Sequence, residues 1–552
     1  MNQRQYVLDQ HVLGRHFLGH HVLGHHVSGH HVSGHYFLGR HFLGHHVLGR
    51  HVLGRQSSGQ HSWFRAATVL LAALVLAGCA VGPDYQPPQS APVALASPEQ
   101  ALFSTDQLQR DWWRQLQDPQ LDRLIDLALS RNHDIRIAQA RLAESRAVLD
   151  EKELDQLPAV TLDGRYERSL SQANAGTAGQ RNLAQSYRAG FDATWELDLF
   201  GRLRRAAEGA AARSEAQAAD LAQTRIVVAA EVARNYFELR GAEQRLAVAR
   251  ANLDSQRDSL RVTQAMVTAG RGDEGDLASA RAELETVQAS VPVQVAARRL
   301  ALYRIAVLAG MRPVELGELD AGKPLAPLTA KLPIGDVGAL LSRRPDILAA
   351  ERSMAAANAD VGVATAELYP RIDLGGFLGF VALRGADFGS SSSRAFSVAS
   401  GVNWPAFHLP TALARKRGAV ARSDGEVARY EQTVLRAVEE LESALTEFGQ
   451  TQQRLGSLAQ AAAYSGRAAE LAQLRYREGS APYLTVLDAQ RTLLRAQDAV
   501  AVAETDSYTR LIALYKALGG GWEADPNTNP SVNPDANPGA NPGVNPEPAA
   551  AG

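Results

Sequence analysis

The sequence predicts an α+β membrane protein made mainly of long α-helices, with four β-strands in each chain. Two observations lead to this prediction. The chain contains two copies of one structural unit, which indicates an internal duplication. Each copy places a pair of segments with two-residue apolar alternation, typical of strands, before an uninterrupted helical run.

Four strands are too few to close a barrel on their own. About eight strands is the lower practical limit, and open sheet edges are not tolerated in lipid. If the strands enter a membrane, the chain has to oligomerise, and three chains would form a twelve-stranded transmembrane β-barrel, an even number within the bacterial range. A water-exposed sheet with one polar face has the same alternation, so the strands alone leave both interpretations open.

The composition excludes several classes of protein. The 552 residues include 57 basic and 59 acidic side chains, for a formal net charge of −2. Binding of nucleic acid needs a basic surface, so nucleic acid is not an expected partner. Cys79 is the only cysteine, which rules out internal disulfides and thiolate zinc sites. No run of 18 apolar residues occurs, so no transmembrane helix is expected.

Residues 1–60 form a His- and Gly-rich leader of low complexity. Glycine recurs at every fifth position from Gly14 to Gly59, and fourteen of the sixteen histidines lie between His11 and His61. A five-residue period matches neither the helix nor the strand, so we expect no packed structure here. The leader is either a translated tandem repeat upstream of the real start or a metal-binding His tract, and the period favours the first interpretation.

Residues 61–78 have the features of a lipoprotein signal peptide. After Arg65 comes an apolar stretch too short to span a bilayer, and it ends in LAGC, whose cysteine is Cys79. This ending resembles the lipobox of bacterial lipoproteins, which implies that Cys79 is acylated and becomes the mature N-terminus. Several acyl chains anchor stably where one would be marginal. Ala80, and not Asp, follows the cysteine, which favours the outer membrane; the alternative is a buried free cysteine.

The duplication sets the expected organisation of the rest of the chain. One constant shift in numbering carries Pro158 onto Pro370, and a second, slightly smaller shift carries Trp195 onto Trp404. The expected segments are a first structural repeat at 79–330, a second at 331–522 and an Asn/Pro-rich tail at 523–552. In the tail, proline recurs every fourth residue and little apolar surface is available, so we expect disorder there.

Two-residue alternation marks the strands in each copy. We expect four strands, near residues 160, 187–199, 372–380 and 396–404. In the second of these, Phe191 and Trp195 alternate with Asp192, Glu196 and Asp198. In a membrane barrel the acidic set would line water and the aromatic set would face lipid.

A long helix follows each strand pair. Residues 203–268 contain no proline, and a continuous helix of that length would extend roughly 100 Å at about 1.5 Å per residue. The chain then turns back near Gly270 in the first copy and near Gly479 in the second. Apolar seams with 3-4 spacing at Leu277–Val291 and Val486–Val500 are typical of coiled-coil packing.

The order of several motifs resembles a known family. CAVGPDYQPP is followed by DWWRQLQDPQLDRLIDLAL, WELDLFGR, LSRRPDILAAE, VLDAQRTLLRAQ and ALGGGW. This order closely resembles TolC-like outer-membrane efflux channels, specifically their NodT-type lipoprotein branch, over about residues 79–522. The resemblance implies a homotrimer with a β-barrel in the outer membrane and a periplasmic α-barrel. It also implies a passive exit duct for drugs or other small toxic solutes, delivered by an inner-membrane pump and a periplasmic adaptor.

The same resemblance assigns site residues. The helical turns imply contact with the adaptor through Gly270, Arg271, Gly272, Gly479 and Ser480. The resemblance places Asp488 in a ring of carboxylates at the closed periplasmic aperture and Leu484 in an apolar ring one turn earlier, with Asp276 as the corresponding acidic candidate of the first copy. A ring of carboxylates at a constriction attracts cations. The alternative for Asp488 is a charged residue on a solvent-exposed helix face without a role in the channel.

No enzyme pattern accompanies these features. Outside the leader only His133 and His408 remain among the histidines, and no GxSxG, HExxH or P-loop motif occurs. We therefore expect neither an enzyme nor a cofactor. The competing function is a periplasm-spanning coiled-coil lipoprotein scaffold without channel activity, against which the paired amphipathic strands argue.

Overall fold

The computed structural model of the chain describes residues 80–88, 103–104, 106, 110–172, 181–319, 325, 328, 333–334 and 344–520. All described residues lie within the unit Thr68–Gly552. The predictions for the leader, the signal peptide, Cys79 and the tail concern residues outside this set.

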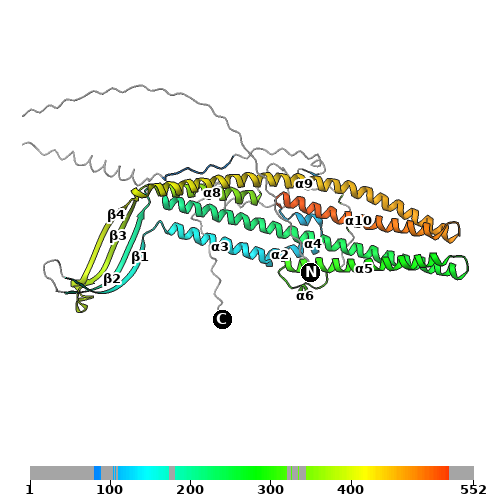
Figure 1. Ribbon diagram of the computed structural model, residues 1–552, viewed down its shortest axis with the longest axis horizontal. Helices are drawn as coiled ribbons and strands as arrows, with labels where there is room; N and C mark the ends of the chain where they lie inside the picture. The colour runs from blue at the N-terminus through cyan, green and yellow to red at the C-terminus, as the bar shows by residue number, and fades with distance from the viewer. Residues whose placement is uncertain are drawn as a thin grey trace, which may run out of the picture. The chain divides into compact units, whose positions relative to one another are not determined.

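The described elements form two series (Figure 1). The first consists of α2 (Pro119–Arg131), α3 (His133–Leu154), β1 (Ala159–Gln172), β2 (Arg181–Leu197), α4 (Arg202–Thr268) and α5 (Glu274–Leu308). The second consists of α8 (Pro345–Ala366), β3 (Arg371–Ala382), β4 (Arg394–Asn403), α9 (Leu409–Arg477) and α10 (Tyr483–Ala517). Shorter elements are the 3-10 turns η2 (Trp112–Leu116), η3 (Gly385–Asp387), η4 (Ser391–Ser393) and η5 (Ala406–His408), and the single-turn helix α6 (Pro313–Leu316).

Two offsets in numbering, one for α3 and α8 and a slightly smaller one for α5 and α10, relate the two series. The offset between the starts of α3 and α8 equals the offset between their ends, so the two helices have the same length. The same holds for α5 and α10. The C-terminal ends of α4 and α9 keep the offset of α5 and α10. The predicted internal duplication is therefore confirmed, element by element.

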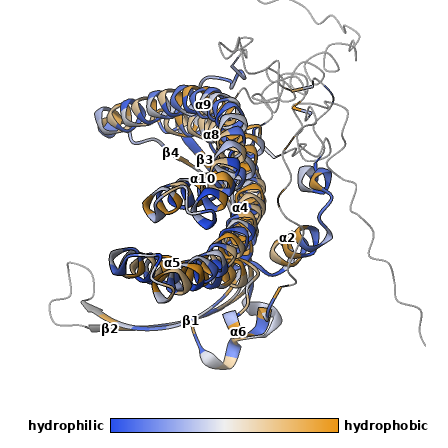
Figure 2. Cartoon of the chain, turned by 90° about the vertical axis from the view of Figure 1, so that its right-hand side faces the viewer, coloured by the Kyte–Doolittle hydropathy of each residue, from blue (hydrophilic) through white to orange (hydrophobic). Residues whose placement is uncertain are grey.

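The predicted long helix is present as α4, which has 67 residues. Alanine makes up much of its buried face, and such small side chains let neighbouring helices approach closely. It packs against α3, α5, α8 and α10. Viewed along the helices, α9, α8, α4 and α5 follow an arc with α10 on its inner side (Figure 2).

The largest apolar core fixes the segment before α2 to the long helices. Trp112 stacks on Tyr515 of α10 with ring centroids 4.8 Å apart. The hydroxyl of Tyr236 in α4 donates a hydrogen bond of 2.6 Å to Asp118, whose other carboxylate oxygen caps α2. This core therefore joins elements from the two copies.

The four strands form one antiparallel sheet in the order β1-β2-β3-β4. A row of large apolar side chains crosses it from edge to edge, through the register pairs of Leu162, Phe191, Leu378 and Phe396. These four side chains are exposed, Leu162 at 73% and Phe396 at 80%. The sheet therefore has one apolar face open to its surroundings, and β1 and β4 each have one edge without a strand partner among the described residues.

Proline occurs twice within or at the start of the long helices. Pro410 lies in the first turn of α9, where a missing backbone donor costs nothing, so it starts the helix and does not bend it. Pro292 lies inside α5, which continues through it. None of the helices that the structure describes has the length and apolarity needed to cross a bilayer.

Candidate aperture at the helical tips

The turn between α4 and α5 is a glycine-terminated helix end. Gly270 has a φ of +67°, which L side chains rarely adopt. Its N–H donates to the carbonyl of Val267 at 2.9 Å, and the N–H of Arg271 donates to Met266 at 2.8 Å. This pair of bonds is the Schellman motif, which satisfies the last carbonyls of α4.

The turn between α9 and α10 repeats this geometry. Gly479 has a φ of +72°, its N–H donates to Tyr476 at 2.9 Å, and the N–H of Ser480 donates to Arg475 at 2.8 Å. The residues predicted at the two tips, Gly270, Arg271, Gly272, Gly479 and Ser480, are all exposed. Each tip is therefore a rigid turn whose backbone and side chains are open to a partner.

Asp488 and Leu484 lie on one exposed face of α10. They are one helical turn apart, Leu484 is 60% exposed, and Asp488 is exposed as well. The opposite face of the same turns is buried, through Tyr483, Val486 and Leu487. The tip thus presents an apolar residue and a carboxylate one turn apart along one exposed face of α10.

Asp276 does not hold the position that corresponds to Asp488. It is the third residue of α5, whereas Asp488 is the sixth residue of α10, and the position equivalent to Asp488 is occupied by Ser279. The sequence analysis paired Asp276 with Asp488 because both are acidic, although the shift that aligns α5 with α10 does not bring them together. Burial raises the pKa of Asp276, and the nearby carboxylate of Asp273 raises it further.

A half-buried ion pair near Asp488 was missed by the sequence analysis. Glu283 of α5 has a side chain only 5% exposed, and it accepts bonds of 2.8 and 2.6 Å from Nε and Nη2 of Arg491 in α10. This pair joins the two tip helices less than one turn beyond Asp488. The sequence gives one indication that Glu283 is buried: it directly precedes Leu284 of the predicted apolar seam.

The seam itself is less apolar than predicted. Leu277, Ala280 and Val287 are buried, but Leu284 and Val291 are half-buried. In α10 only Val486 of the predicted set is buried, and Gln490 takes a buried position, where it donates to Ser259 of α4 at 2.8 Å.

Two tyrosines complete the packing at the tips. The rings of Tyr476 and Tyr483 lie 5.5 Å apart, and both hydroxyl groups are buried without a hydrogen-bond partner in the described part of the chain. Burial is the main cause that raises the pKa of Tyr483, to about 12. The tip halves of the helices are therefore held by a small apolar cluster and polar contacts, in contrast to the larger core near α2.

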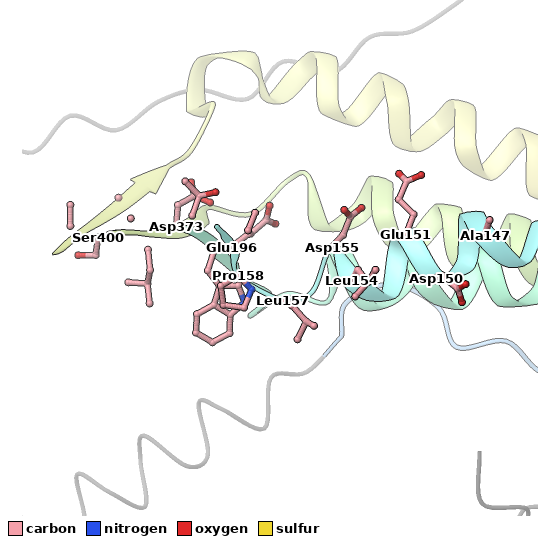
Figure 3. A pocket seen from close by; sticks show the side chains of 17 residues that line it. Ala147, Asp150, Glu151, Leu154, Asp155, Leu157, Pro158, Glu196, Asp373 and Ser400 are labelled. Atoms are coloured by element: carbon pink, nitrogen blue, oxygen red, sulfur yellow. The ribbon is translucent and has the colours of Figure 1, made fainter. Parts of the chain in front are cut away.

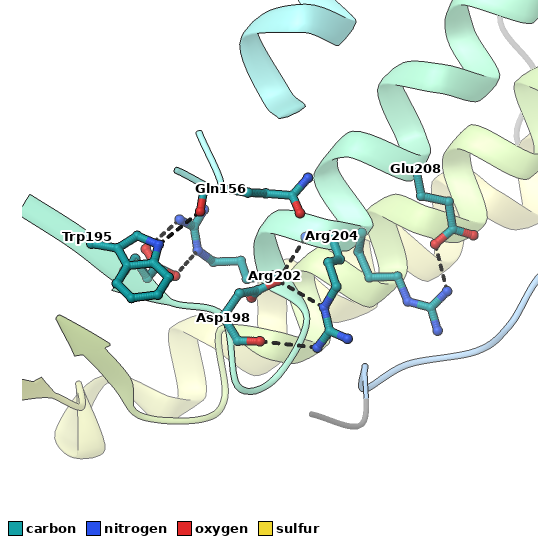
Figure 4. A network of polar contacts seen from close by, with 8 residues as sticks. Gln156, Trp195, Asp198, Arg202, Arg204 and Glu208 are labelled. Carbon is teal, nitrogen blue, oxygen red and sulfur yellow. Dashed lines mark hydrogen bonds and ion pairs between the residues drawn. The ribbon is translucent and has the colours of Figure 1, made fainter. Parts of the chain in front are cut away.

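Ion pairs and hydrogen bonds fix the crossover from β2 to α4 (Figure 4). Arg202 binds Glu196 through two bonds of 2.8 and 2.6 Å. Asp198 accepts the backbone N–H of Arg204 at 2.9 Å, so it caps the first turn of α4. Asp198 lies beyond the end of β2, so its predicted place on the water-lining face of that strand is wrong.

A cleft of about 1160 Å³ lies where the strands meet α3 (Figure 3). Small residues from all four strands line it: Ala159, Thr194, Gly375, Ala399 and Gly401. The carboxylates of Glu151, Asp155, Glu196 and Asp373 point to one side there. Glu196 is paired with Arg202, and Glu151 and Asp155 are both paired with Lys152, so most of this acidic charge has a basic partner.

The residues that follow Cys79 are fixed to this same junction. The N–H of Val81 donates to the carbonyl of Phe200 at 3.1 Å, and a side chain at Gly82 would collide with the backbone of Gly362. Asp84 forms an ion pair with the buried Arg205 of α4. The start of the described chain is therefore held beside the ends of the strands.

A sheet with one exposed apolar face, continued by long paired helices that end in exposed turns, defines an outer-membrane channel protein. Comparison with known proteins leads to the same class. The family described as outer membrane efflux protein matches residues 124–310 and 337–520, and the chain belongs to this family.

Relatives and solved structures are similar over most of the chain. The solvent efflux pump outer membrane protein SrpC of Pseudomonas putida is 32% identical over 83% of this chain and 98% of its own length. OprJ of Pseudomonas aeruginosa is 31% identical over 83% and 96%. The outer-membrane channel OprN is 44% identical with a TM-score of 0.78, over 80% of this chain and 100% of that chain. The open state of the Neisseria gonorrhoeae MtrE channel is 30% identical, with a TM-score of 0.72 over 80% and 98%.

These findings confirm the predicted class and location. The chain is an efflux channel of the outer membrane and not an enzyme, because the family consists of transport channels. The alternative of a scaffold without channel activity does not agree with this membership.

Proposed function

We propose that three copies of this chain form a passive exit duct in the outer membrane, for drugs or other small toxic solutes. An inner-membrane pump and a periplasmic adaptor would deliver the solutes. The observation that carries the proposal is the four-stranded sheet, which has one exposed apolar face and, within the described residues, two unpaired edges. Three such sheets supply the strands of a closed barrel, whose apolar face meets lipid.

The relatives supply the proposed class of cargo. Their names include a solvent efflux pump protein, a toluene efflux pump protein and an antibiotic efflux pump protein, all from Pseudomonas putida. These solutes differ in structure but are small, which suits a wide duct that does not select strongly.

Cys79 is the proposed lipid anchor. It directly precedes Ala80, and a side chain at Gly201 in the β2–α4 crossover would collide with Ala80. Acyl chains on Cys79 would therefore begin at the level where the strands end and the helices begin. That is the level at which the inner leaflet of the outer membrane would lie around a barrel made from these strands.

The exposed turns are the proposed contact with the adaptor. Gly270, Arg271 and Gly272 form one tip, and Gly479 and Ser480 form the other. The two tips have the same backbone geometry but different chemistry, since only the first carries an arginine. An adaptor could therefore bind both tips in the same way and still distinguish them.

Asp488 and Leu484 are the proposed aperture. In a trimer, their shared face of α10 would bring three carboxylates and three leucines toward the axis. Asp276 remains an acidic candidate at the level of the tips, where its negative charge contributes to the raised pKa of Tyr483 in α10.

Two measurements on the purified full-length protein test the proposal. Heat-modifiable migration in SDS gels, with a trimer mass in detergent, is expected for a barrel made by three chains. Planar bilayers that contain the protein are expected to carry discrete single-channel currents. Monomeric protein that conducts no current would contradict the proposal and leave a lipoprotein scaffold.

A further inference from the structure

Two motifs that are far apart in the sequence meet beside α4. Trp112 and Trp113 of DWWRQL line a cavity of about 330 Å³, and Gly520 of ALGGGW lines the same cavity. The rest of its apolar wall comes from α2 and α4, through Leu129, Ala222, Ile226 and Ala229. Neither the sheet nor the helical tips include this cavity, so transport through the channel does not explain it.

The rim of the cavity carries positive charge. Arg110 precedes the two tryptophans, Arg225 lies on α4, and both are exposed. Neither arginine forms an ion pair within the described part of the chain. Asp111 also lines the cavity, but its carboxylate is paired with Nε of Arg114 at 3.4 Å. The cavity therefore fits a group that is apolar at one end and negatively charged at the other.

The end of α10 is fixed against this cavity. The N–H of Gly519 donates to the carbonyl of Lys516 at 3.0 Å. The N–H of Gly520 donates to Tyr515 at 2.8 Å, so the two bonds form a Schellman motif. Gly520 has a φ of +60°, and a Cβ there would lie 2.9 Å from Cγ2 of Ile226. The residue after Gly520 therefore starts from the wall of the cavity.

The five residues after Gly520 have the chemistry that the cavity fits. They read GWEAD, in which Trp522 is followed by the carboxylates of Glu523 and Asp525. Trp522 is the only aromatic residue of 521–552, and this stretch contains neither lysine nor arginine. An extended chain advances at most about 3.6 Å per residue, so Trp522 lies no farther than roughly 7 Å along the chain from Gly520. The cavity is within its reach.

We propose that residues 521–525 dock in this cavity of their own chain. The indole of Trp522 lies against the two tryptophans of the wall and against α4, and the carboxylates of Glu523 and Asp525 pair with the two rim arginines. Burial of an indole removes about 150–250 Å² of surface from water, which is the main driving force for the docking. The docked segment joins the C-terminal end of α10 to α2 and α4.

The position of the docked segment suits the channel. Helix α10 carries Asp488 and Leu484 near its start at the tip, so docking holds the opposite end of the helix that bears the proposed aperture. Pro526 begins the four-residue proline period, and proline lacks a backbone donor, so the docked segment ends before it. The disordered tail would then begin at Pro526 and not at residue 523.

A separate ligand is a less suitable occupant than this segment. The segment is tethered two residues from the cavity wall, which corresponds to an effective concentration in the roughly millimolar range. A second copy of the chain or another protein would have to displace it. The experiments below therefore include crosslinking to another chain as an outcome.

Cleavage of the full-length protein by chymotrypsin tests the docking. The protease cuts after aromatic residues, so cleavage after Trp522 releases residues 523–552, which mass spectrometry detects. Val544→Phe, introduced into every sample, creates a reference cleavage site in the tail. A synthetic peptide of residues 519–552 with the same substitution corrects for the intrinsic preference of the protease.

Docking should protect the bond after Trp522. After this correction, we expect its cleavage to be at least about tenfold slower than cleavage at the reference site, because the segment has to leave the cavity first. Equal corrected rates at the two sites would overturn the docking.

Charge reversal at the rim tests the electrostatic part of the proposal. Arg110→Glu combined with Arg225→Glu should accelerate cleavage after Trp522 and leave the reference cleavage unchanged. The control combines Arg136→Glu with Arg250→Glu, two exposed arginines that do not line the cavity. Cleavage after Trp522 that the first pair leaves unaltered, or that the control pair accelerates equally, would overturn the pairing of the segment with the rim.

Photocrosslinking locates the docked side chain. p-Benzoylphenylalanine in place of Trp522 keeps an aromatic group at this position. After irradiation, we expect crosslinked peptides that contain Trp112 and Trp113, or Ile226. The same group in place of Val544 is the control and should not crosslink to these peptides. Crosslinks from position 522 to another chain, or only to other segments of this chain, would overturn the proposed site.

Discussion

Trp195 and Trp404, which hold equivalent positions in the two copies, make the same hydrogen bond. The indole Nε1 of Trp195 donates to the carbonyl of Gln156 at 2.9 Å, and that of Trp404 donates to Leu368 at 3.1 Å. In each copy the bond ties the end of a strand that leaves the sheet to the segment through which the chain enters it. The sheet is therefore joined to the helices twice, each time by the same type of hydrogen bond.

Replacing either tryptophan by phenylalanine should weaken the junction to a similar degree. The aromatic ring remains but the N–H donor is lost, which costs about 0.5–1.5 kcal/mol per hydrogen bond. Thermal unfolding of the detergent-solubilised protein measures the loss, with Phe407→Leu as control because Phe407 is 98% exposed. A loss at one tryptophan only would contradict the equivalence of the two junctions.

The tips should become more tightly closed on acidification. The pKa of Asp276 is raised above its ordinary value of 3.8, mainly by burial, so the folded tip holds this proton more tightly than the unfolded chain does. Stability is therefore lost as the pH rises through the raised pKa and regained on acidification. Single-channel open probability should fall as the pH is lowered through this raised pKa.

Asp276→Asn should remove much of that pH dependence, because its amide does not titrate. Asp258→Asn is the control, since Asp258 is a well-exposed residue of α4. An equal pH response in wild type and Asp276→Asn would assign the effect to another group.

Arg491→Ala should loosen the α5–α10 contact. It leaves the buried Glu283 carboxylate without its partner, which costs about 1–3 kcal/mol. Hydrogen exchange of the first turns of α10 should accelerate, whereas Arg510→Ala should have little effect because its partner Glu447 is half-exposed. Adding Glu283→Gln to Arg491→Ala should recover most of the protection; no recovery would show that the arginine acts through another contact.

Acylation should require Cys79. Radiolabelled palmitate is expected to enter the wild type but not Cys79→Ser, and the mature protein is expected to begin at residue 79. Labelling that survives the substitution would exclude the lipobox interpretation. An intact mass that includes residues before Cys79 would exclude it equally.

Much of the fold follows from local periodicity. Helix α4 begins one residue before the predicted start and ends at the predicted residue, since neither proline nor a glycine turn interrupts it before Gly270. The strands follow from two-residue alternation, and the repeats follow from the two shifts. The helix and the strands depend on residues that are close in the sequence, and the repeats are found by comparing two segments directly.

The contacts at the tips could not be predicted in the same way. Glu283 and Arg491 lie far apart in the sequence, and a single glutamate beside an apolar seam is normally a solvated residue. Asp198 continues the alternation of β2 in the sequence, but the chain turns at Gly201, with a φ of +79°, and makes it a helix cap. The partners of these side chains depend on how the helices pack against one another, which the local sequence does not specify.

Single-channel recording tests most directly whether the outer-membrane duct rests nearly closed at Asp488. Asp488→Ala should raise the conductance and weaken block by divalent cations, because a carboxylate ring binds hard cations. Leu484→Ser should raise the conductance without changing cation block, and Asp258→Ala, which removes a carboxylate from α4, should change neither. Well-assembled Asp488→Ala trimers with the conductance and cation block of the wild type would contradict the account.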